Sequence, residues 1–289
     1  MKQKTLELQK LYLEGQEILK EQGISEYSID AWYLLEYVTG ITKASYYANP
    51  CRELTEEQAR RYRNCIEKRS RKIPLQHITG EQEFMGYTFR VNEHVLIPRQ
   101  DTEILVEEAL KKIGSGMHIL DMCTGSGCIL LSLLKMKQER YSVRDLKGTG
   151  VDVSEEALKV AKENAKHLSV EAVFLQSDLF TQVEGVYDVI VSNPPYIETG
   201  VIEELQEEVR LHDPYIALDG KEDGLFFYRK IIKESIAYIK RGGWILFEIG
   251  YDQAEAVAEL LKKSGYGQVS VKKDLAGLDR VVSAVYYGR

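Results

Sequence analysis

The sequence lacks the features of a membrane-spanning, secreted or metal-clustered protein. No apolar run approaches the roughly 18 residues that a bilayer span needs. The N-terminal Met1-Lys2-Gln3-Lys4 leads into an amphipathic segment rather than the apolar core of a signal peptide. The four cysteines include no CxxC pair, and the five histidines form no HExxH or similar motif. We therefore expect a cytoplasmic protein with reduced thiols and no metal site.

The sequence also lacks an excess of basic charge. Its net charge of −7 argues against a protein whose affinity comes mainly from neutralising phosphates, so we expect neither a membrane partner nor direct nucleic-acid binding. One segment is locally basic, and its cations are Arg60, Arg61, Arg63, Lys68, Arg69, Arg71 and Lys72. This segment is either a solvated helix face or a docking surface for an acidic partner or RNA.

The N-terminal part of the chain has helical patterns. Apolar residues from Leu6 to Leu19 predict a first helix, and Asp30 to Val38 predict a second that stops at Gly40. A third helix begins after Thr55, with Glu57 and Gln58 in a capping arrangement, and runs to Lys72 before Pro74. We predict a helical substrate-docking domain over residues 1–75.

A change of pattern follows this domain. Short alternating pieces between Phe84 and Pro98, around Gly86 and Asn92-Glu93, predict a β-hairpin that joins two domains. We assign this linker to residues 76–100, which leaves residues 101–289 for a second domain. A chain of 289 residues is long enough for both.

The second domain alternates strands and helices. The expected strands are Met117–Met122, Gly148–Val153, Val170–Gln176, Tyr187–Ser192 and Trp244–Ile249. The expected helices are Cys128–Lys137, Ser154–His167, Asp223–Lys240 and Asp252–Lys263. The last strands, Gln268–Lys273 and Arg280–Tyr286, are joined too closely for a crossover helix and should form an antiparallel hairpin. The pattern predicts an α/β fold with a doubly wound, mostly parallel, seven-stranded sheet.

Ligands of such sheets bind beyond the carboxyl ends of the strands, where three loops of this chain carry polar groups. The turn Asp121–Gly127 contains Gly125 and Gly127, which would let a ligand approach the backbone. Asp152 is placed to accept hydrogen bonds from both hydroxyls of a ribose. Asp178 could accept from an adenine amino group and Leu179 could pack on the ring, although each aspartate could instead cap its own loop.

These loops favour an adenosine cofactor other than a dinucleotide. The dinucleotide fingerprint needs a third glycine where this chain has Leu130. S-adenosylmethionine carries no pyrophosphate, and its sulfonium methyl is an electrophile. We therefore predict S-adenosylmethionine, with S-adenosylhomocysteine as the product.

The tetrapeptide Asn193-Pro194-Pro195-Tyr196 follows the predicted strand Tyr187–Ser192. Pro195 holds Pro194 extended and aims its carbonyl, Asn193 adds a side-chain acceptor, and Tyr196 offers a flat ring for stacking. Two acceptors could hold an NH₂ group out of plane, which would make the nitrogen of an amide or exocyclic amine nucleophilic. The alternative is an ordinary Asn-Pro turn that closes a strand.

The chain resembles the HemK/PrmC family, the glutamine methyltransferases that modify peptide chain release factors. The matching segments are Asp30-Ala31 to Leu35, Ile78-Thr79-Gly80 with Glu83-Phe84, Leu96-Ile97-Pro98-Arg99 with Asp101-Thr102-Glu103, Thr124 to Gly127, Val151 to Ser154, Asn193 to Tyr196, Ala217 to Gly220, Asp223-Gly224-Leu225, Glu248-Ile249-Gly250, and Asp274 to Gly277 with Asp279-Arg280. The tetrapeptide alone is shared with adenine and guanine amino methyltransferases, whereas the segment from Ile97 to Glu103 is much more specific.

The resemblance implies a class I methyltransferase fold and methylation of the side-chain amide of the glutamine in a release factor's Gly-Gly-Gln loop. By position, the methionine part of the cofactor would be held by Cys123, Thr124, Gly125, Ser126 and Gly127. Asp152 would hold the ribose, Asp178 and Leu179 the adenine side, and Asn193 would touch both ligands. Asn193, Pro194, Pro195 and Tyr196 would hold the glutamine amide, with Asn193, Pro194 and Tyr196 catalytic.

The sequence departs from the family pattern at three positions: Cys123 stands where the loop often begins with glycine, Gln100 replaces a common proline, and His77 a common tyrosine. If position 123 needs a positive φ, cysteine costs on the order of 1 kcal/mol there. Two other functions stay open: an amino methyltransferase acting on RNA or DNA, and a non-catalytic scaffold that binds the cofactor.

Overall fold

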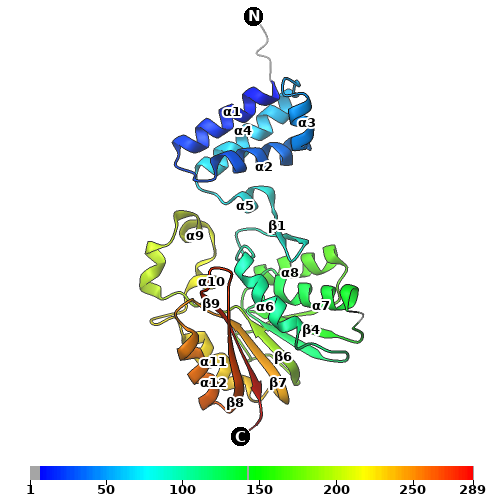
Figure 1. Cartoon of the computed structure of the whole chain (residues 1–289), viewed down its shortest axis with the longest axis vertical. Helices are drawn as coiled ribbons and strands as arrows, with labels where there is room; N and C mark the ends of the chain where they lie inside the picture. Colours follow the sequence, from blue (N-terminus) through cyan, green and yellow to red (C-terminus); the bar gives the residue numbers. More distant parts are fainter. Residues whose placement is uncertain (1–6, 142, 289) are drawn as a thin grey trace, which may run out of the picture. The chain divides into compact units, whose positions relative to one another are not determined.

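The computed structural model describes residues 7–141 and 143–288. The chain divides into two compact units (Figure 1), which are Met1–Gly80 with Glu207–His212, and Glu81–Gln206 with Asp213–Arg289. Leu6, which the sequence pattern includes in the first helix, lies outside the described residues. The predicted domain limits of 1–75, 76–100 and 101–289 stay predictions.

The first unit is helical. Its helices are α1 (Leu8–Glu21), α2 (Tyr27–Thr39), α3 (Lys43–Ala48), α4 (Glu56–Ser70), α5 (Leu75–Thr79) and α9 (Glu207–His212). They enclose a core in which Trp32 and Tyr62 are buried. The three predicted helices are confirmed, as is the capping box, in which Thr55 and Gln58 bond to each other's backbone N–H. Gly40 ends α2 in the left-handed conformation, with φ of 68°.

The basic segment is not a uniform solvated face, because Arg69 is buried. Arg69 donates hydrogen bonds of 2.6 Å to Asp30 and of 2.6 Å to Glu208. Two more of its cations pair with glutamates, Arg63 with Glu14 and Arg71 with Glu67. The exposed cations that form no ion pair with any described residue are Arg60, Arg61 and Lys68. The prediction of seven clustered surface charges is therefore wrong at Arg69, which binds the helices together from inside.

The β-hairpin belongs to the second unit and lies earlier than predicted. Its strands are β1 (Glu81–Phe84) and β2 (Tyr87–Arg90), rather than pieces between Phe84 and Pro98. Met85 and Gly86 form the turn, with φ of 53° and 79°. Two consecutive positive φ angles are typical of the tight turn that matches the twist of hairpin strands, so the connection needs only these two residues.

A seven-stranded sheet forms the centre of the second unit, as predicted. Its strands are β3 (His118–Met122), β4 (Lys147–Asp152), β5 (Val173–Gln176), β6 (Tyr187–Ser192), β7 (Ile239–Glu248), β8 (Tyr266–Lys273) and β9 (Asp279–Tyr286). They lie in the order β5-β4-β3-β6-β7-β9-β8, and only the pairings of β9 with β7 and β8 are antiparallel. The sheet is therefore doubly wound. From β3 the chain adds β4 and β5 on one side, and then returns to add β6 and β7 on the other side of β3.

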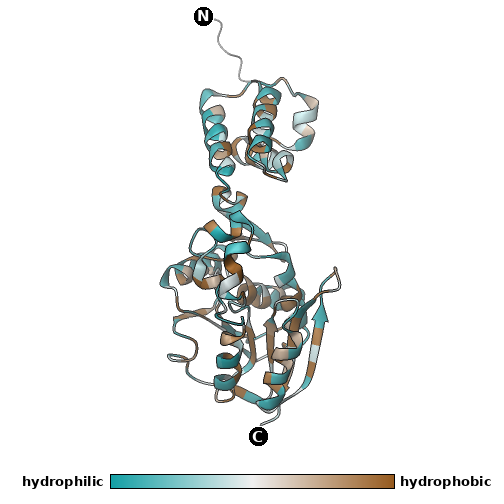
Figure 2. Cartoon of the chain, turned by 90° about the vertical axis from the view of Figure 1, so that its left-hand side faces the viewer, coloured by the Kyte–Doolittle hydropathy of each residue, from teal (hydrophilic) through white to brown (hydrophobic). Residues whose placement is uncertain are grey.

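Helices cover both faces of this sheet. Residues of α6 (Gln100–Leu110), α7 (Cys128–Arg140) and α8 (Glu155–Leu168) share one core with the hairpin. Residues of α11 (Phe226–Ser235) and α12 (Ala254–Lys263) share the opposite core. In Figure 2 the central strands are coloured mainly as hydrophobic, and the helices carry both hydrophilic and hydrophobic residues. The connection after β6 contains the short helices η1 (Thr199–Glu204) and α10 (Tyr215–Leu218), and α9 lies between them in the sequence.

Two element boundaries differ clearly from the predictions. The helix expected over Asp223–Lys240 is only Phe226–Ser235, and the strand expected from Trp244 begins at Ile239. The early part of β7 contains Gly242, with φ of 82°, and its pairing with β6 shifts register there. Across the described residues, no helix is long and apolar enough to cross a bilayer.

Candidate functional site

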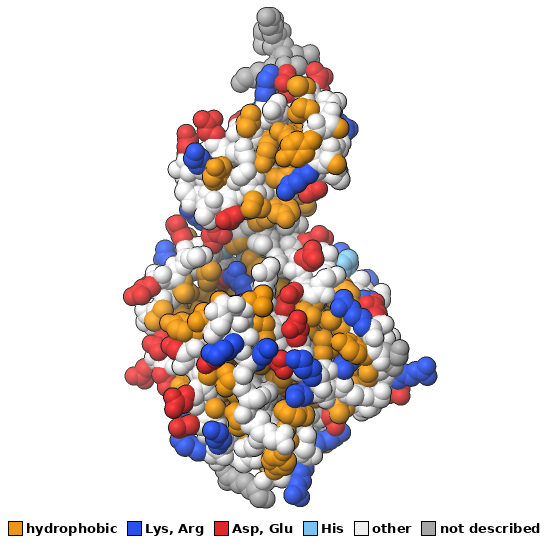
Figure 3. Space-filling model, in the orientation of Figure 1, with side chains coloured by type: hydrophobic (Ala, Val, Ile, Leu, Met, Phe, Trp, Pro, Cys, Tyr) orange, Lys and Arg blue, Asp and Glu red, His pale blue; other side chains and the backbone are white. Residues whose placement is uncertain are grey.

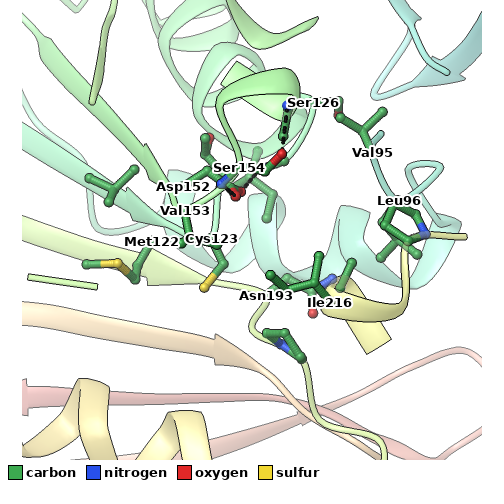
Figure 4. Close-up of a pocket in the computed structure, with 18 of the residues that line it drawn as sticks. Val95, Leu96, Met122, Cys123, Ser126, Asp152, Val153, Ser154, Asn193 and Ile216 are labelled. Atoms are coloured by element: carbon green, nitrogen blue, oxygen red, sulfur yellow. Dashed lines mark hydrogen bonds between the residues drawn. The ribbon is translucent and has the colours of Figure 1, made fainter. Parts of the chain in front are cut away.

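A cavity of about 300 Å³ lies at the carboxyl ends of β3, β4 and β6 (Figure 4). A volume of this order is typical of pockets for small molecules. The site residues predicted from the sequence that line this cavity are Cys123, Thr124, Gly125, Ser126, Asp152, Asp178, Leu179, Asn193 and Pro195. Thus residues from four loops that are distant in the sequence meet at one end of the sheet. Gly127, Pro194 and Tyr196 were also predicted but are not among the described residues that line it.

The loop after β3 is held by its own side chains. Thr124 donates a hydrogen bond of 2.6 Å to Asp121, and its backbone N–H bonds to Val151 of β4. Burial raises the pKa of Asp121 to about 7, although the bond from Thr124 opposes this shift. Hydrogen bonds within the protein therefore hold this loop against the neighbouring strand β4.

Glycine is required at positions 125 and 127 of this loop for different structural reasons. Gly125 has φ of 53°, and a Cβ atom there would meet nothing within 4 Å. It therefore leaves open space at the cavity, as predicted. At Gly127, with φ of 78°, a Cβ would lie 3.3 Å from Cβ of Ala161 on α8. Gly127 thus allows close packing of two helices, rather than a ligand's approach.

Cys123 has φ of 63°, so the strain considered for a cysteine at this position is present. Its side chain lines the cavity, and burial raises the pKa of its thiol. Leu179 at the opposite loop is also left-handed, with φ of 49°. Two non-glycine residues with positive φ therefore border one cavity. Backbone strain of this kind is commonly associated with functional sites.

We expect Cys123→Val to lower the free energy of unfolding by about 1–3 kcal/mol, because a β-branched residue tolerates a positive φ poorly. Cys128→Val is the control, since Cys128 is a buried cysteine at the start of the regular helix α7, whereas Cys123 is partly buried. Urea unfolding can be followed by fluorescence of Trp244 in a Trp32→Phe background, because the chain has two tryptophans. Equal destabilisation by the two substitutions would contradict the argument from backbone strain.

Asp152 ends β4 with both carboxylate oxygens fixed. Its Oδ2 accepts a hydrogen bond of 2.9 Å from the Gly125 N–H, and Oδ1 accepts one of 3.0 Å from the Ser154 N–H. Burial raises the pKa of Asp152, while these backbone donors act in the opposite direction. A carboxylate has about four acceptor positions, so two bonds leave capacity for a ligand. Ser154 caps α8, because its side chain accepts a hydrogen bond of 3.1 Å from the Ala157 N–H.

Asp178 and Leu179 follow β5 and border the same cavity. Asp178 is exposed, whereas Leu179 is buried and packs with the core beneath the sheet. A carboxylate beside an apolar wall suits a flat, partly polar ring. The geometry brings these two residues to the position at which the sequence placed them.

Asn193 lies at the cavity directly after β6 (Figure 4). Its Nδ2 donates to Oγ1 of Thr102 on α6 over 3.4 Å, and no described residue donates a hydrogen bond to its Oδ1. The amide oxygen is therefore available as an acceptor. This interaction with Thr102 was not predicted, because α6 and β6 are far apart in the sequence.

Pro194 and Tyr196 are not among the described residues that line the cavity, so the acceptor role predicted for the Pro194 carbonyl stays a prediction. Pro194 is buried, and the partly buried Tyr196 packs against the core that contains Tyr228. The Tyr196 hydroxyl donates to Oε1 of Glu248 over 3.4 Å. The stacking and catalytic roles predicted for Tyr196 therefore stay predictions.

The backbone of Tyr196 is clamped by residues that the sequence analysis did not single out as functional. Its carbonyl accepts a hydrogen bond of 3.0 Å from Nε2 of Gln253, whose Oε1 accepts from the Gly250 N–H. A Cβ atom at Gly220 would lie 2.7 Å from the Tyr196 backbone, and one at Gly224 would clash with the same carbonyl. Only glycine fits these two positions without moving the tetrapeptide.

Two residues of the segment from Ile97 to Glu103 hold surrounding loops. Arg99 lines the cavity and donates a hydrogen bond of 2.6 Å to the buried Asp213. Glu103 accepts one of 2.7 Å from the Met85 N–H and so binds the hairpin turn to α6. The remaining wall includes Leu96 and Ile216, whose apolar character gave no sequence signal for a site.

Two segments of the chain match family models. Residues 10–80 match the PrmC N-terminal domain, and residues 99–209 match the methyltransferase small domain. The chain is also similar in fold to the 16S rRNA N2 G1207 methyltransferase of T. thermophilus, solved with AdoMet and guanosine. That likeness has a TM-score of 0.50 at 17% identity and covers 71% of this chain and 49% of the other.

Two relatives that match almost the whole chain carry the same name. The release factor glutamine methyltransferase of Caulobacter vibrioides is 42% identical, over 97% of each chain. That of Clostridium botulinum is 40% identical, over 97% of this chain and 99% of its own. Similarity of this extent includes the cavity loops, the tetrapeptide and the helical unit together. The chain belongs to the release factor glutamine methyltransferase family.

Proposed function

We propose that this enzyme transfers a methyl group from S-adenosylmethionine to the side-chain amide nitrogen (N5) of the glutamine in the Gly-Gly-Gln motif of peptide chain release factors. The observation that carries the proposal is the free Oδ1 of Asn193 at the cavity, which Asp152 borders at another strand end. An acceptor for an amide and an acceptor for ribose hydroxyls thus share one enclosed space. The family relationship supports the same donor and substrate.

The residues present fit this methyl donor. Gly125 leaves open space beside the cavity, and the loop residues from Cys123 to Ser126 would hold the methionine part. Asp152 keeps acceptor capacity for ribose hydroxyls, and Asp178 with Leu179 would hold the adenine. When bound, the cofactor supplies the electrophilic sulfonium methyl.

The enzyme's own contribution is to hold the substrate nitrogen in a reactive geometry. An amide nitrogen is barely nucleophilic while its lone pair is delocalised. Asn193 Oδ1 and the Pro194 carbonyl would accept its two N–H groups and favour the tetrahedral nitrogen of the transition state over the planar ground state. Burial raises the pKa of the Tyr196 phenol, with Glu248 adding to the shift, so this group keeps its proton near neutral pH. The proton of the methylated nitrogen would pass to water.

The decisive experiment is incubation with labelled S-adenosylmethionine and purified release factors, followed by mass-spectrometric location of the label. We expect one methyl group on the glutamine of the Gly-Gly-Gln motif, and none on a release factor in which that glutamine is alanine. Incorporation into ribosomal RNA or DNA instead would favour an amino methyltransferase acting on nucleic acid. Binding of the cofactor without turnover on any of these substrates would favour a scaffold.

We expect Gly220→Ala to lower kcat by about 10- to 100-fold, because displacement of a reacting group by an ångström or less has effects of this size. The new Cβ would press on the Tyr196 backbone, 2.7 Å away, and so move the tetrapeptide. Gly200→Ala is the control, since a Cβ at Gly200 meets nothing within 4 Å. Initial rates at saturating substrates measure both, and similar rates for the two variants would contradict the clamp.

A further inference from the structure

The strands β8 and β9 are joined by residues 274–278, which we call the hairpin tip (Figure 1). The Leu275 side chain is fully exposed there, and Leu278 is also exposed. Single exposed leucines are common on protein surfaces, so exposure alone does not indicate a function. What distinguishes this pair is the rigidity of the tip and its place in the fold.

Asp274 holds the hairpin tip in one conformation. Its Oδ1 accepts hydrogen bonds of 2.9 Å from the Ala276 N–H and of 2.9 Å from the Leu278 N–H. Its backbone N–H donates to the Leu278 carbonyl over 2.8 Å, and its carbonyl accepts from the Gly277 N–H over 3.1 Å. Leu275 is thus held outside the fold by a network of hydrogen bonds and does not sit on a loose loop.

Arg280 connects the hairpin tip to the end of the sheet that carries the cavity. Its Nη2 donates to Asp274 over 3.0 Å and lies 3.2 Å from a carboxylate oxygen of Asp101, in the first turn of α6. Arg99 and Thr102, on either side of Asp101 in the sequence, line the cavity. The tip therefore lies at the same end of the sheet as the cavity, beside a segment that forms part of its wall.

A tyrosine from the loop after β7 adds to the exposed apolar surface. The Ile249 N–H donates a hydrogen bond of 2.9 Å to the Arg280 carbonyl, which continues the antiparallel pairing of β7 with β9. Two residues beyond this bond on each chain segment are Tyr251 and Leu278, and both side chains are exposed. Two neighbouring loops thus contribute Tyr251, Leu275 and Leu278, which we call the hairpin-tip surface.

The hairpin-tip surface adjoins the tetrapeptide as well as the cavity wall. The loop that carries Tyr251 also carries Gln253, which bonds to the Tyr196 carbonyl over 3.0 Å. A cavity of about 300 Å³ admits small molecules and single side chains, but not a folded protein. A protein substrate must therefore rest most of its contact area, about 800 Å² in a typical complex, on the surface around the cavity.

We propose that the hairpin-tip surface is a docking surface for the release-factor domain that carries the Gly-Gly-Gln motif, with Leu275 as its anchor. The proposal rests on the proposed function, and it names the part of the enzyme that holds the protein substrate while the glutamine side chain enters the cavity. The partner should offer an apolar hollow, because the Leu275 side chain neither donates nor accepts a hydrogen bond. A preformed tip loses little conformational freedom on binding, so more of the apolar contact appears as affinity.

The first test is Leu275→Asp, measured as the dissociation constant of a purified release factor from the enzyme saturated with S-adenosylhomocysteine. We expect this constant to rise by about 10- to 100-fold, which is the effect of losing the burial of one leucine side chain. Leu275→Met, which is apolar and of similar volume, should retain most of the affinity. The affinity for S-adenosylhomocysteine itself should be unchanged, because Leu275 is not among the described residues that line the cavity.

Val186→Asp is the matched control. Val186 is also exposed, but it precedes β6 and so lies at the opposite end of the sheet from the cavity. This substitution should leave the affinity for the release factor unchanged, and because both side chains are exposed, neither variant should have a lower melting temperature. Unchanged affinity in Leu275→Asp would overturn the proposal, and so would an equal loss in the two variants.

A second test concerns the rigidity of the tip. Asp274→Ala removes the acceptor of the Ala276 and Leu278 N–H groups, so we expect release-factor binding to weaken by about 3- to 10-fold from the added cost of ordering the tip. In the Leu275→Asp background the same change should add little, because the anchor is already lost. Fully additive losses would count against Leu275 as the anchor.

A different occupant of this surface would be a second copy of the chain. Sedimentation velocity of the wild type and of Leu275→Asp tests it: a wild-type dimer that the substitution dissociates, with release-factor affinity unchanged, would overturn the proposal. Failure of the proposed function gives another result, because a release factor that binds through Leu275 but is not methylated would leave the docking surface in place. Normal affinity and normal methylation in Leu275→Asp would reject the surface and leave the function standing.

Discussion

Asn193→Ala is expected to lower kcat by about 100- to 1,000-fold, by analogy with the loss of one preorganised hydrogen-bond donor from an oxyanion hole. The substitution removes the free Oδ1 at the cavity and leaves the Pro194 carbonyl as the remaining acceptor. The glutamine nitrogen would then be held by one N–H group and would remain closer to planar. Single-turnover methylation of a release factor measures the effect on the chemical step.

The control for this prediction is Asn64→Ala, because Asn64 is exposed on the helix α4 and should leave the rate unchanged. Affinity for S-adenosylhomocysteine should change little in Asn193→Ala, since most of the proposed cofactor contacts come from other loops. An unchanged kcat would exclude the proposed grip on the amide. A large loss of cofactor affinity with unchanged kcat would assign Asn193 to the cofactor alone.

Asp152→Ala is expected to weaken binding of S-adenosylhomocysteine by about 10- to 100-fold, since a hydrogen bond to a charged group contributes about 1.5–3 kcal/mol. It removes the proposed ribose acceptor and the group that fixes the Gly125 N–H at 2.9 Å. Isothermal titration calorimetry measures the dissociation constant directly. At saturating cofactor, kcat should fall much less than it does in Asn193→Ala.

Asp178→Asn is the matched comparison for this second prediction. Asp178 is exposed, and the bond proposed for it is to a neutral amino group, so we expect a loss of about tenfold or less. Equal affinity of Asp152→Ala and the wild type would show that the ribose is held elsewhere. A larger loss in Asp178→Asn than in Asp152→Ala would reverse the assigned roles of the two aspartates.

Elements with a strong periodic pattern were predictable from the sequence. The strand β6 begins and ends where the apolar run Tyr187–Ser192 indicated, and Thr55 and Ser154 cap their helices. The short helices α3, α5 and α10 were missed, because four to six residues carry too little periodicity. The start of β7 was missed because Lys240 to Gly243 has no strand pattern, and its neighbours in the sheet hold it extended.

The candidate site also contains residues that could be predicted from the sequence and contacts that could not. Residues that follow a strand in the sequence, such as Asp152 and Asn193, were placed correctly at the cavity because parallel strands bring their ends together. Thr102, Glu248 and Gln253 contact the tetrapeptide from other elements, and no spacing along the chain indicates those contacts. Figure 3 shows that cations and acidic side chains are interspersed on the face in view. A count of charges along the sequence does not reveal this arrangement.

The position of β9 has a consequence for how this protein folds during its synthesis. β9 (Asp279–Tyr286) follows both β7 and β8 in the chain, yet it occupies an interior place between them. Until those residues have left the exit tunnel, β7 and β8 each lack a neighbour and present open edges. The sheet therefore closes only when its last strand, β9, has been made and inserted between two strands that precede it in the chain.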